Sequence, residues 1–258
     1  MAVRSTAEID AMPAIPFLRP AVALCLLLGA SAPALAGPYE TGSTSTARGI
    51  KFKSNVQLKH GADKDTWVLP KFGVGGPLAD NLELTMGTGY GRIERADGRD
   101  SHGMRDLSVG MKWRLLDEQG RRPALAIEPS LSLPTGDRAS GIGKGAYALE
   151  LPVRASRRFG DMRLTGEASM QRTFGRDADK LGAGLLLEYV AAPHWSCGIE
   201  LVADAPRQDL GARELRLNIG AKRRIGRHLQ WQALAGRSVD DPRGGRTSTV
   251  KLALEYLL

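Results

Sequence analysis

Cysteine is scarce in this 258-residue chain, which contains only Cys25 and Cys197. Cys25 lies in an N-terminal apolar run, so a single cysteine remains once that run is removed, and an internal disulfide is excluded. A small secreted fold held together by disulfides is excluded for the same reason. The cysteines and histidines lack the spacing of a zinc site, and we expect neither a metal nor another cofactor.

Long apolar runs are also missing beyond the N-terminal region. Hydrophobic residues make up 42% of the chain, and the mean hydropathy is -0.22. Because no later run reaches the ~18 to 20 apolar residues that a membrane helix needs, a helical membrane protein is excluded. The net charge of +8 could favour nucleic acid, but basic residues are interspersed with acidic ones, so we do not expect that partner.

Residues 1–36 have the features of a cleavable signal peptide. Arg19 precedes the apolar run 21–28, and Ala34-Leu35-Ala36 forms a small-x-small cleavage site. Acidic residues are unusual before such a run, yet Glu8 and Asp10 occur there. Translation from Met12 is therefore a second interpretation, which N-terminal mapping of the precursor would test.

Residues 37–50 are rich in glycine, serine and threonine and show no hydrophobic period. This composition predicts a flexible periplasmic lead-in. From Lys51 onward the pattern changes to an alternation of apolar and polar residues with a period of two, which is typical of strands. The predicted strands, about twelve in number, cover residues 51–60, 67–74, 82–91, 106–115, 124–133, 146–158, 162–174, 181–191, 195–204, 213–224, 229–237 and 248–258.

Short and long connections alternate between these strands. Residues 159–161, 192–194 and 225–228 form short turns, whereas 92–105 and 134–145 form long loops; the remaining connections are shorter ones at 75–81 and 117–122 and longer ones at 205–212 and 238–247. Outer-membrane barrels have short periplasmic turns and long external loops. The sequence therefore predicts an all-β fold, in which residues 51–258 form one transmembrane antiparallel up-and-down barrel with both termini in the periplasm.

Alternation alone does not show which face of a strand points inward. In a membrane barrel the polar face lines the lumen, and the charged mid-strand candidates are Glu128, Glu150, Arg154, Arg163, Glu167, Glu188, Glu200 and Arg216. If Glu150 pairs with Arg154, or Arg163 with Glu167, such pairs could plug the lumen. The C-terminal strand alternates apolar residues from Val250 to Leu258, as expected of a strand that closes a barrel.

Aromatic residues gather near the predicted strand ends, which is typical of the two interfacial girdles of a membrane barrel. The alternative explanation is that aromatics simply favour strands, but this would place them centrally as well. The girdle candidates are Trp67, Tyr90, Trp113, Tyr147, Tyr189, Trp195, Trp231 and Tyr256.

Two kinds of motif could carry chemistry. Gly87-x-Gly89-x-Gly91 and the glycines of 141–145 lack the following helix of a phosphate-binding loop, so we interpret them as barrel and loop glycines. Ser101-His102 and His60 are the candidates for a hydrolase site at the outer rim, but no serine signature surrounds them. We therefore expect no enzymatic activity, and an outer-membrane hydrolase is kept as an alternative.

One region resembles the meta-pathway phenol-degradation family of outer-membrane transporters. Gly103-Met-Arg-Asp106 opens a strand, and one hairpin later the run LSLPTG, residues 131–136, leads into the glycine-rich loop 141–145. The resemblance is clearest over 73–161. It implies an outer-membrane barrel associated with uptake of hydrophobic or aromatic compounds. Our leading hypothesis is therefore a channel for such small solutes in the bacterial outer membrane, and the basic charge of the chain suits contact with lipopolysaccharide beside the membrane lipid. A structural or adhesive barrel without transport is the other alternative.

Overall fold

The computed structural model describes residues 38–192, 194–242 and 245–258, so the predicted signal peptide and the alternative start at Met12 lie outside the described residues. The described part of the chain contains one short 3-10 helix, η1 (Leu210–Ala212), and fourteen strands. These are β1 (Lys51–His60), β2 (Lys64–Ala79), β3 (Leu82–Arg95), β4 (Ser101–Met104), β5 (Leu107–Leu116), β6 (Ala124–Ile127), β7 (Ser130–Leu133), β8 (Ala148–Phe159), β9 (Met162–Thr173), β10 (Lys180–Ala192), β11 (Trp195–Pro206), β12 (Glu214–Ile225), β13 (Leu229–Asp240) and β14 (Ser248–Leu257).

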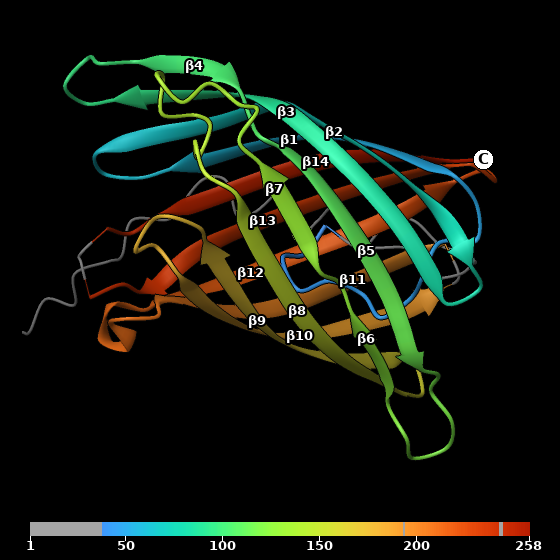
Figure 1. Ribbon diagram of the computed structural model, residues 1–258. Coiled ribbons are helices and arrows are strands. Elements are labelled where there is room, and N and C mark those ends of the chain that lie inside the picture. Colours follow the sequence, from blue (N-terminus) through green and yellow to red (C-terminus); the bar gives the residue numbers. More distant parts are fainter. Residues whose placement is uncertain (1–37, 193, 243–244) are drawn as a thin grey trace, which may run out of the picture.

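The strands form one closed antiparallel barrel (Figure 1). β1 pairs with β14 along its whole length, from Lys51 opposite Leu257 to His60 opposite Ser248, so the sheet has no free edge there. β4 and β5 both pair with β3, and β6 and β7 both lie between β5 and β8. Each of these two pairs acts as one interrupted strand, which leaves twelve positions around the barrel within the described residues. The predicted strand number is confirmed.

The interruption between β6 and β7 falls at Pro129, which has no amide hydrogen to donate to the sheet. Several strands extend beyond their predicted bounds, β2 and β3 furthest. β2 and β3 continue through residues 75–79 and 92–95, which the sequence pattern assigned to connections, and β4 occupies part of the predicted loop 92–105. The reason is that backbone hydrogen bonds of a hairpin form whatever the side chains are, so a glycine-rich stretch can remain in the ladder.

The barrel wall is polar on its inner face and apolar on its outer face, which is the reverse of a soluble barrel. Among the described side chains, the largest fully buried ones are mostly polar and include Gln232, Glu83 and Glu200, whereas Phe72 and Leu252 are 56% and 49% exposed. An apolar exterior around a polar interior is the arrangement of a transmembrane β-barrel. The predicted fold class is therefore confirmed, including the face assignment that alternation alone left open.

The two ends of the barrel can be told apart by their connections. The end at which β1 begins and β14 ends carries the short turns 80–81, 160–161 and 226–228 together with the longer connection 117–123, and is called the turn end. The opposite loop end carries the connections 61–63, 96–100, 134–147, 174–179 and 207–213. That the turn end faces the periplasm stays a prediction. Among the described residues, no helix has the length and apolarity needed to cross a membrane.

Candidate functional site: the barrel interior

Residues 38–49, called the inner segment below, lie inside the barrel (Figure 1). Tyr39, Thr41, Thr44 and Ala47 are buried, and the segment is hydrogen-bonded to the inner wall. The prediction of a flexible periplasmic lead-in is therefore wrong for these residues. A segment without a hydrophobic period gives no sign of its partners, because it contacts the wall through its own backbone amides and small hydroxyl side chains.

The inner segment follows the wall from β12 to β3. The Tyr39 hydroxyl donates to the carbonyl of Gly220 on β12 at 2.8 Å, and the Thr44 and Ser156 hydroxyl oxygens lie 2.6 Å apart. Glutamates supply the other anchors, because a carboxylate accepts backbone N–H groups strongly. Glu200 accepts from Glu40 and Thr41, Glu167 from Gly42 at 2.9 Å, and Glu83 from Ala47 at 2.8 Å.

The predicted interior charges lie on the inner face of the wall. Arg154, Glu188, Glu200 and Arg216 are buried there. Glu128 and Glu167 are partly buried, Arg163 is opposite Glu188, and Glu150 shares the Arg154 face of β8 but is exposed to solvent.

Arg154 lies at the centre of one ion-pair network. It contacts Glu128 and, at 2.5 Å, Glu167, while Lys112 lies 3.3 Å from Glu128. The pairings considered from the sequence, of Glu150 with Arg154 and of Arg163 with Glu167, are not among the ion pairs of the described residues. Residues four apart on a strand are separated by about 13 Å, whereas directly opposed residues on neighbouring strands are about 5 Å apart, and Arg154 is directly opposite Glu167.

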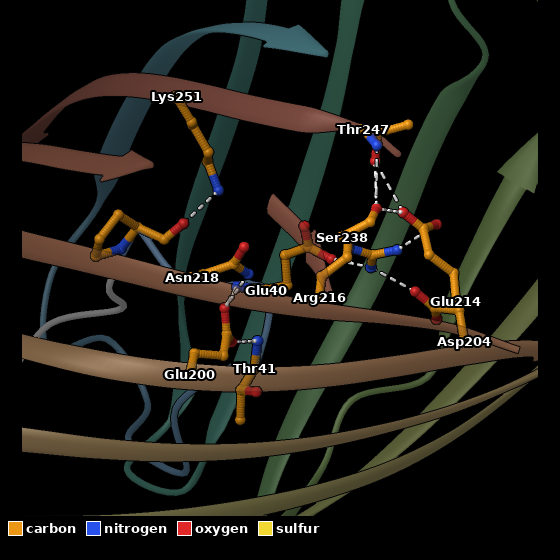
Figure 2. Close-up of polar contacts among 11 residues, drawn as sticks. Glu40, Thr41, Glu200, Asp204, Glu214, Arg216, Asn218, Ser238, Thr247 and Lys251 are labelled. Carbon is orange, nitrogen blue, oxygen red and sulfur yellow. Dashed lines mark hydrogen bonds and ion pairs between the residues drawn. The ribbon is translucent and has the colours of Figure 1, made fainter. Parts of the chain in front are cut away.

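Arg216 holds the loop-end part of the inner segment. Its guanidinium contacts Glu40 of the segment at 2.6 Å, Glu214 at 2.8 Å, and Asp204. Figure 2 shows this cluster beside Glu200, whose carboxylate meets Thr41 and the side chain of Asn218. Arg216 and Glu200 therefore hold neighbouring residues of the inner segment, through the Glu40 side chain and through the backbone amides of Glu40 and Thr41.

Several interior residues were missed by the sequence reasoning. Lys222 pairs with Glu188 at 2.7 Å, and Lys51 pairs with Glu83. Both lysines occupy the inward phase of the alternation, so a systematic assignment of phase along each strand would have found them. The acceptor roles of Glu83 and Glu200 toward the inner segment had no signal in the sequence.

The predicted girdle residues fall into two groups along the barrel. One group lies near the turn end and consists of Trp113, Tyr189, Trp195, Trp231 and Tyr256. The other group lies nearer the loop end and consists of Trp67, Tyr90 and Tyr147. Tyr90, Trp113, Tyr147, Tyr189 and Tyr256 are exposed. That these two groups mark the membrane interfaces stays a prediction.

The two histidines considered for a hydrolase site, His60 and His102, form hydrogen bonds with residues other than serine. His102 Nδ1 lies 2.6 Å from the Tyr90 hydroxyl, and the neighbouring Ser101 accepts a hydrogen bond from Arg95 at 3.0 Å. His60 contacts Asp65 at 2.7 Å. Ser101 and His102 are adjacent strand residues, whose side chains point to opposite faces, so the geometry gives no support to a hydrolase site at these positions.

A family model described as "Putative MetA-pathway of phenol degradation" matches residues 36–250. The match covers most of the chain, including the inner segment and the strands β1 to β13. A comparison with curated proteins finds no match.

Solved structures share the fold at low sequence identity. An outer membrane channel from Pseudomonas putida F1 aligns with a TM-score of 0.63 and 16% identity, over 85% of this chain and 100% of that chain. The translocator domain of the autotransporter NalP from Neisseria meningitidis aligns with a TM-score of 0.56 and 12% identity, over 83% and 90%. The KdgM porin aligns with a TM-score of 0.53 and 11% identity, over 80% and 99%. The fold is that of a bacterial outer-membrane barrel.

Proposed function

Because the chain belongs to the family described by the phenol-degradation pathway model, we propose that it is a passive outer-membrane channel for small aromatic compounds, closed at rest by the inner segment. The observation that carries the proposal is the position of residues 38–49 inside a closed barrel with a polar interior. A barrel whose only role was structural would have no need for a lumen of charged groups, which are costly to bury. The family description supports the aromatic solute.

The contacts of the inner segment suggest how it could move. It is held mainly by hydrogen bonds and ion pairs to Glu167, Glu200 and Arg216, and these bonds can be exchanged for bonds to water as the segment shifts. The apolar core among the buried described residues is small, consisting of Tyr39, Leu186 and Leu234. Displacement of the segment therefore exposes little apolar surface.

A reversible disulfide tests whether the segment must move. The side chains of Thr44 and Ser156 approach closely enough, at 2.6 Å between hydroxyl oxygens, for a Thr44→Cys/Ser156→Cys pair to close on a sulfur–sulfur bond of about 2.0 Å. Cys197→Ser removes the competing thiol. Intact Gram-negative cells that express the variant should take up radiolabelled phenol slowly when oxidised, and several-fold faster after dithiothreitol.

The controls separate the parts of the proposal. Thr44→Cys alone, in the same Cys197→Ser background, should be insensitive to dithiothreitol. Glu200→Ala removes the acceptor of two segment amides and should raise phenol uptake above the wild-type level without reduction. If wild-type cells take up phenol no faster than cells without the protein, the channel proposal is wrong; if the oxidised pair transports as fast as the reduced one, the closing role of the segment is wrong.

A further inference from the structure

A second feature of the interior is a cavity of about 280 Å³ in the wall formed by β14, β1, β2, β3 and β5. This wall is separate in the sheet order from β8 to β12, where most contacts of the inner segment lie. The cavity is close in volume to the smaller of the pockets that hold small molecules, about 300 Å³. It therefore has room for a compound with a single ring.

Glycines create this cavity. Gly73 on β2 lies directly opposite Gly87 on β3, and both line the cavity together with Gly75. A Cβ atom added at Gly73 would have a single neighbour, the carbonyl oxygen of Met86 at 3.6 Å, so the space above this residue is open. The missing side chains leave a flat floor of backbone atoms. The glycine pattern that begins at Gly87 thus has a structural role on the inner face.

Lysines surround the glycine floor. The lining contains five lysines from four strands and three glutamates, an excess of positive charge: Lys51, Lys53, Lys71, Lys112 and Lys251 against Glu83, Glu128 and Glu255. Two of the glutamates are already engaged, because Glu83 contacts Lys51 and the amide of Ala47, and Glu128 contacts Lys112 and Arg154. Their charge is largely neutralised before any solute enters.

We propose that this cavity binds a small aromatic carboxylate, with the ring on the glycine floor and the carboxylate at the ammonium groups of Lys53, Lys71 and Lys251. Ammonium–carboxylate hydrogen bonds are among the strong ones, and more so away from bulk water. The inference rests on the proposed channel function and narrows its solutes from aromatic compounds in general to aromatic acids. Lys251 also donates to the carbonyl of Pro38 in the inner segment at 2.7 Å. A neutral aromatic compound offers no carboxylate to these ammonium groups.

Equilibrium dialysis of the detergent-solubilised full chain tests the inference with three matched probes. Benzoate carries the carboxylate, benzyl alcohol is neutral, and benzylamine is a cation of similar size. Benzoate should bind saturably and at least about tenfold more tightly than benzyl alcohol, the effect of a single charge-assisted contact. Benzylamine should bind more weakly than either.

Two kinds of variant separate the charge from the shape of the site. Lys53→Gln combined with Lys71→Gln should weaken benzoate binding about tenfold or more and leave benzyl alcohol binding unchanged. Gly73→Val should fill the open space and weaken binding of both probes. Lys64→Gln, at an exposed lysine of the loop end, is the matched control and should bind benzoate as the wild type does. The gel shift between unboiled and boiled samples verifies that each variant is folded.

The outcomes distinguish this inference from the channel proposal. Equal affinity for benzoate and benzyl alcohol, or wild-type benzoate affinity in both the lysine double variant and Gly73→Val, would overturn the carboxylate site even if phenol uptake is normal. Benzoate binding that is lost in these variants, in a protein that gives no phenol uptake, would support the site and reject the channel.

Discussion

Arg154 and Glu167 face each other across β8 and β9, with Nε of Arg154 2.5 Å from Oε2 of Glu167. The same carboxylate oxygen accepts the amide hydrogen of Gly42 at 2.9 Å. Glu167 therefore joins two neighbouring strands and the inner segment at one point. Arg154 also contacts Glu128, so two carboxylates share one guanidinium, and Lys112 supplies a second positive charge to Glu128.

Replacement of Arg154 by methionine should destabilise the barrel strongly. The side chain of Arg154 is 8% exposed, and its removal leaves Glu128 and Glu167 with less compensation in a buried site. Breaking a buried ion pair by removing one partner typically costs about 3 to 5 kcal/mol. The expected result is a lower urea midpoint for unfolding in lipid vesicles.

Arg121 offers a control for this measurement, because it is exposed in a turn at the turn end. Arg121→Met changes the charge by the same amount. Its free energy of unfolding should stay within about 0.5 kcal/mol of the wild type, so its urea midpoint should hardly change. An Arg154→Met midpoint equal to that of Arg121→Met would mean that interior water compensates the two carboxylates and that the ion pairs add little to stability.

The period-two alternation was sufficient to predict the barrel. It located twelve strands and placed residues such as Glu188 and Arg216 together on the polar face, because a strand side chain alternates faces regardless of what it contacts. The apolar residues of one phase, such as Leu252 in the closing strand, then had to face lipid in a membrane barrel. Which face points inward was decided only by the burial of Gln232 and Glu200 inside the barrel.

The inner segment and the ion pairs could not be predicted in this way. Thr41 and Gly42 contact strands more than 100 residues further along the chain, and nothing in a stretch of small polar residues specifies such a distant partner. The partner of Arg154 depends on the register between β8 and β9, which alternation within one strand does not fix. The possible pairs named from the sequence, Glu150 with Arg154 and Arg163 with Glu167, were therefore not the ones that form.

Two facing glycines provide a second prediction. A Cβ at Gly87 would lie 2.8 Å from the carbonyl oxygen of Phe72, a backbone atom that cannot easily give way, whereas a Cβ at Gly73 would lie 3.6 Å from its nearest neighbour. Gly87→Ala should therefore destabilise the barrel by about 1 to 3 kcal/mol. Gly73→Ala should be neutral or stabilise it by up to about 1 kcal/mol, since alanine has less freedom in the unfolded chain.

Urea unfolding of both variants under the same conditions gives the comparison. The residues are direct partners on β2 and β3, so any general effect of alanine at this point of the sheet is shared. Destabilisation of similar size at both positions would mean that the contact with Phe72 adds no cost of its own at Gly87. The backbone would then relieve the clash by a shift, and the close approach of the strands would not require a glycine there.

The outer face provides the last prediction. Leu201 lies near the middle of β11, opposite Leu185 on β10 and Leu217 on β12, and all three side chains are exposed. An arginine at the midplane of a membrane barrel costs about 2 to 4 kcal/mol, and one near or beyond the interface costs about 0 to 1 kcal/mol. Leu201→Arg should therefore lower the stability of the barrel in lipid vesicles by an amount in the higher range.

Leu210 in η1 is the matched control, since it is an exposed leucine in a connection at the loop end. Leu210→Arg adds the same side chain and charge outside the strands, and its urea midpoint should stay close to that of the wild type. A loss of stability at Leu201 alone would locate the middle of β11 in the hydrocarbon layer. Both leucines are exposed, but the free-energy cost of an arginine rises with its depth in the bilayer. An equal, small effect at both positions would instead place Leu201 in water and contradict the assignment of the apolar face to lipid.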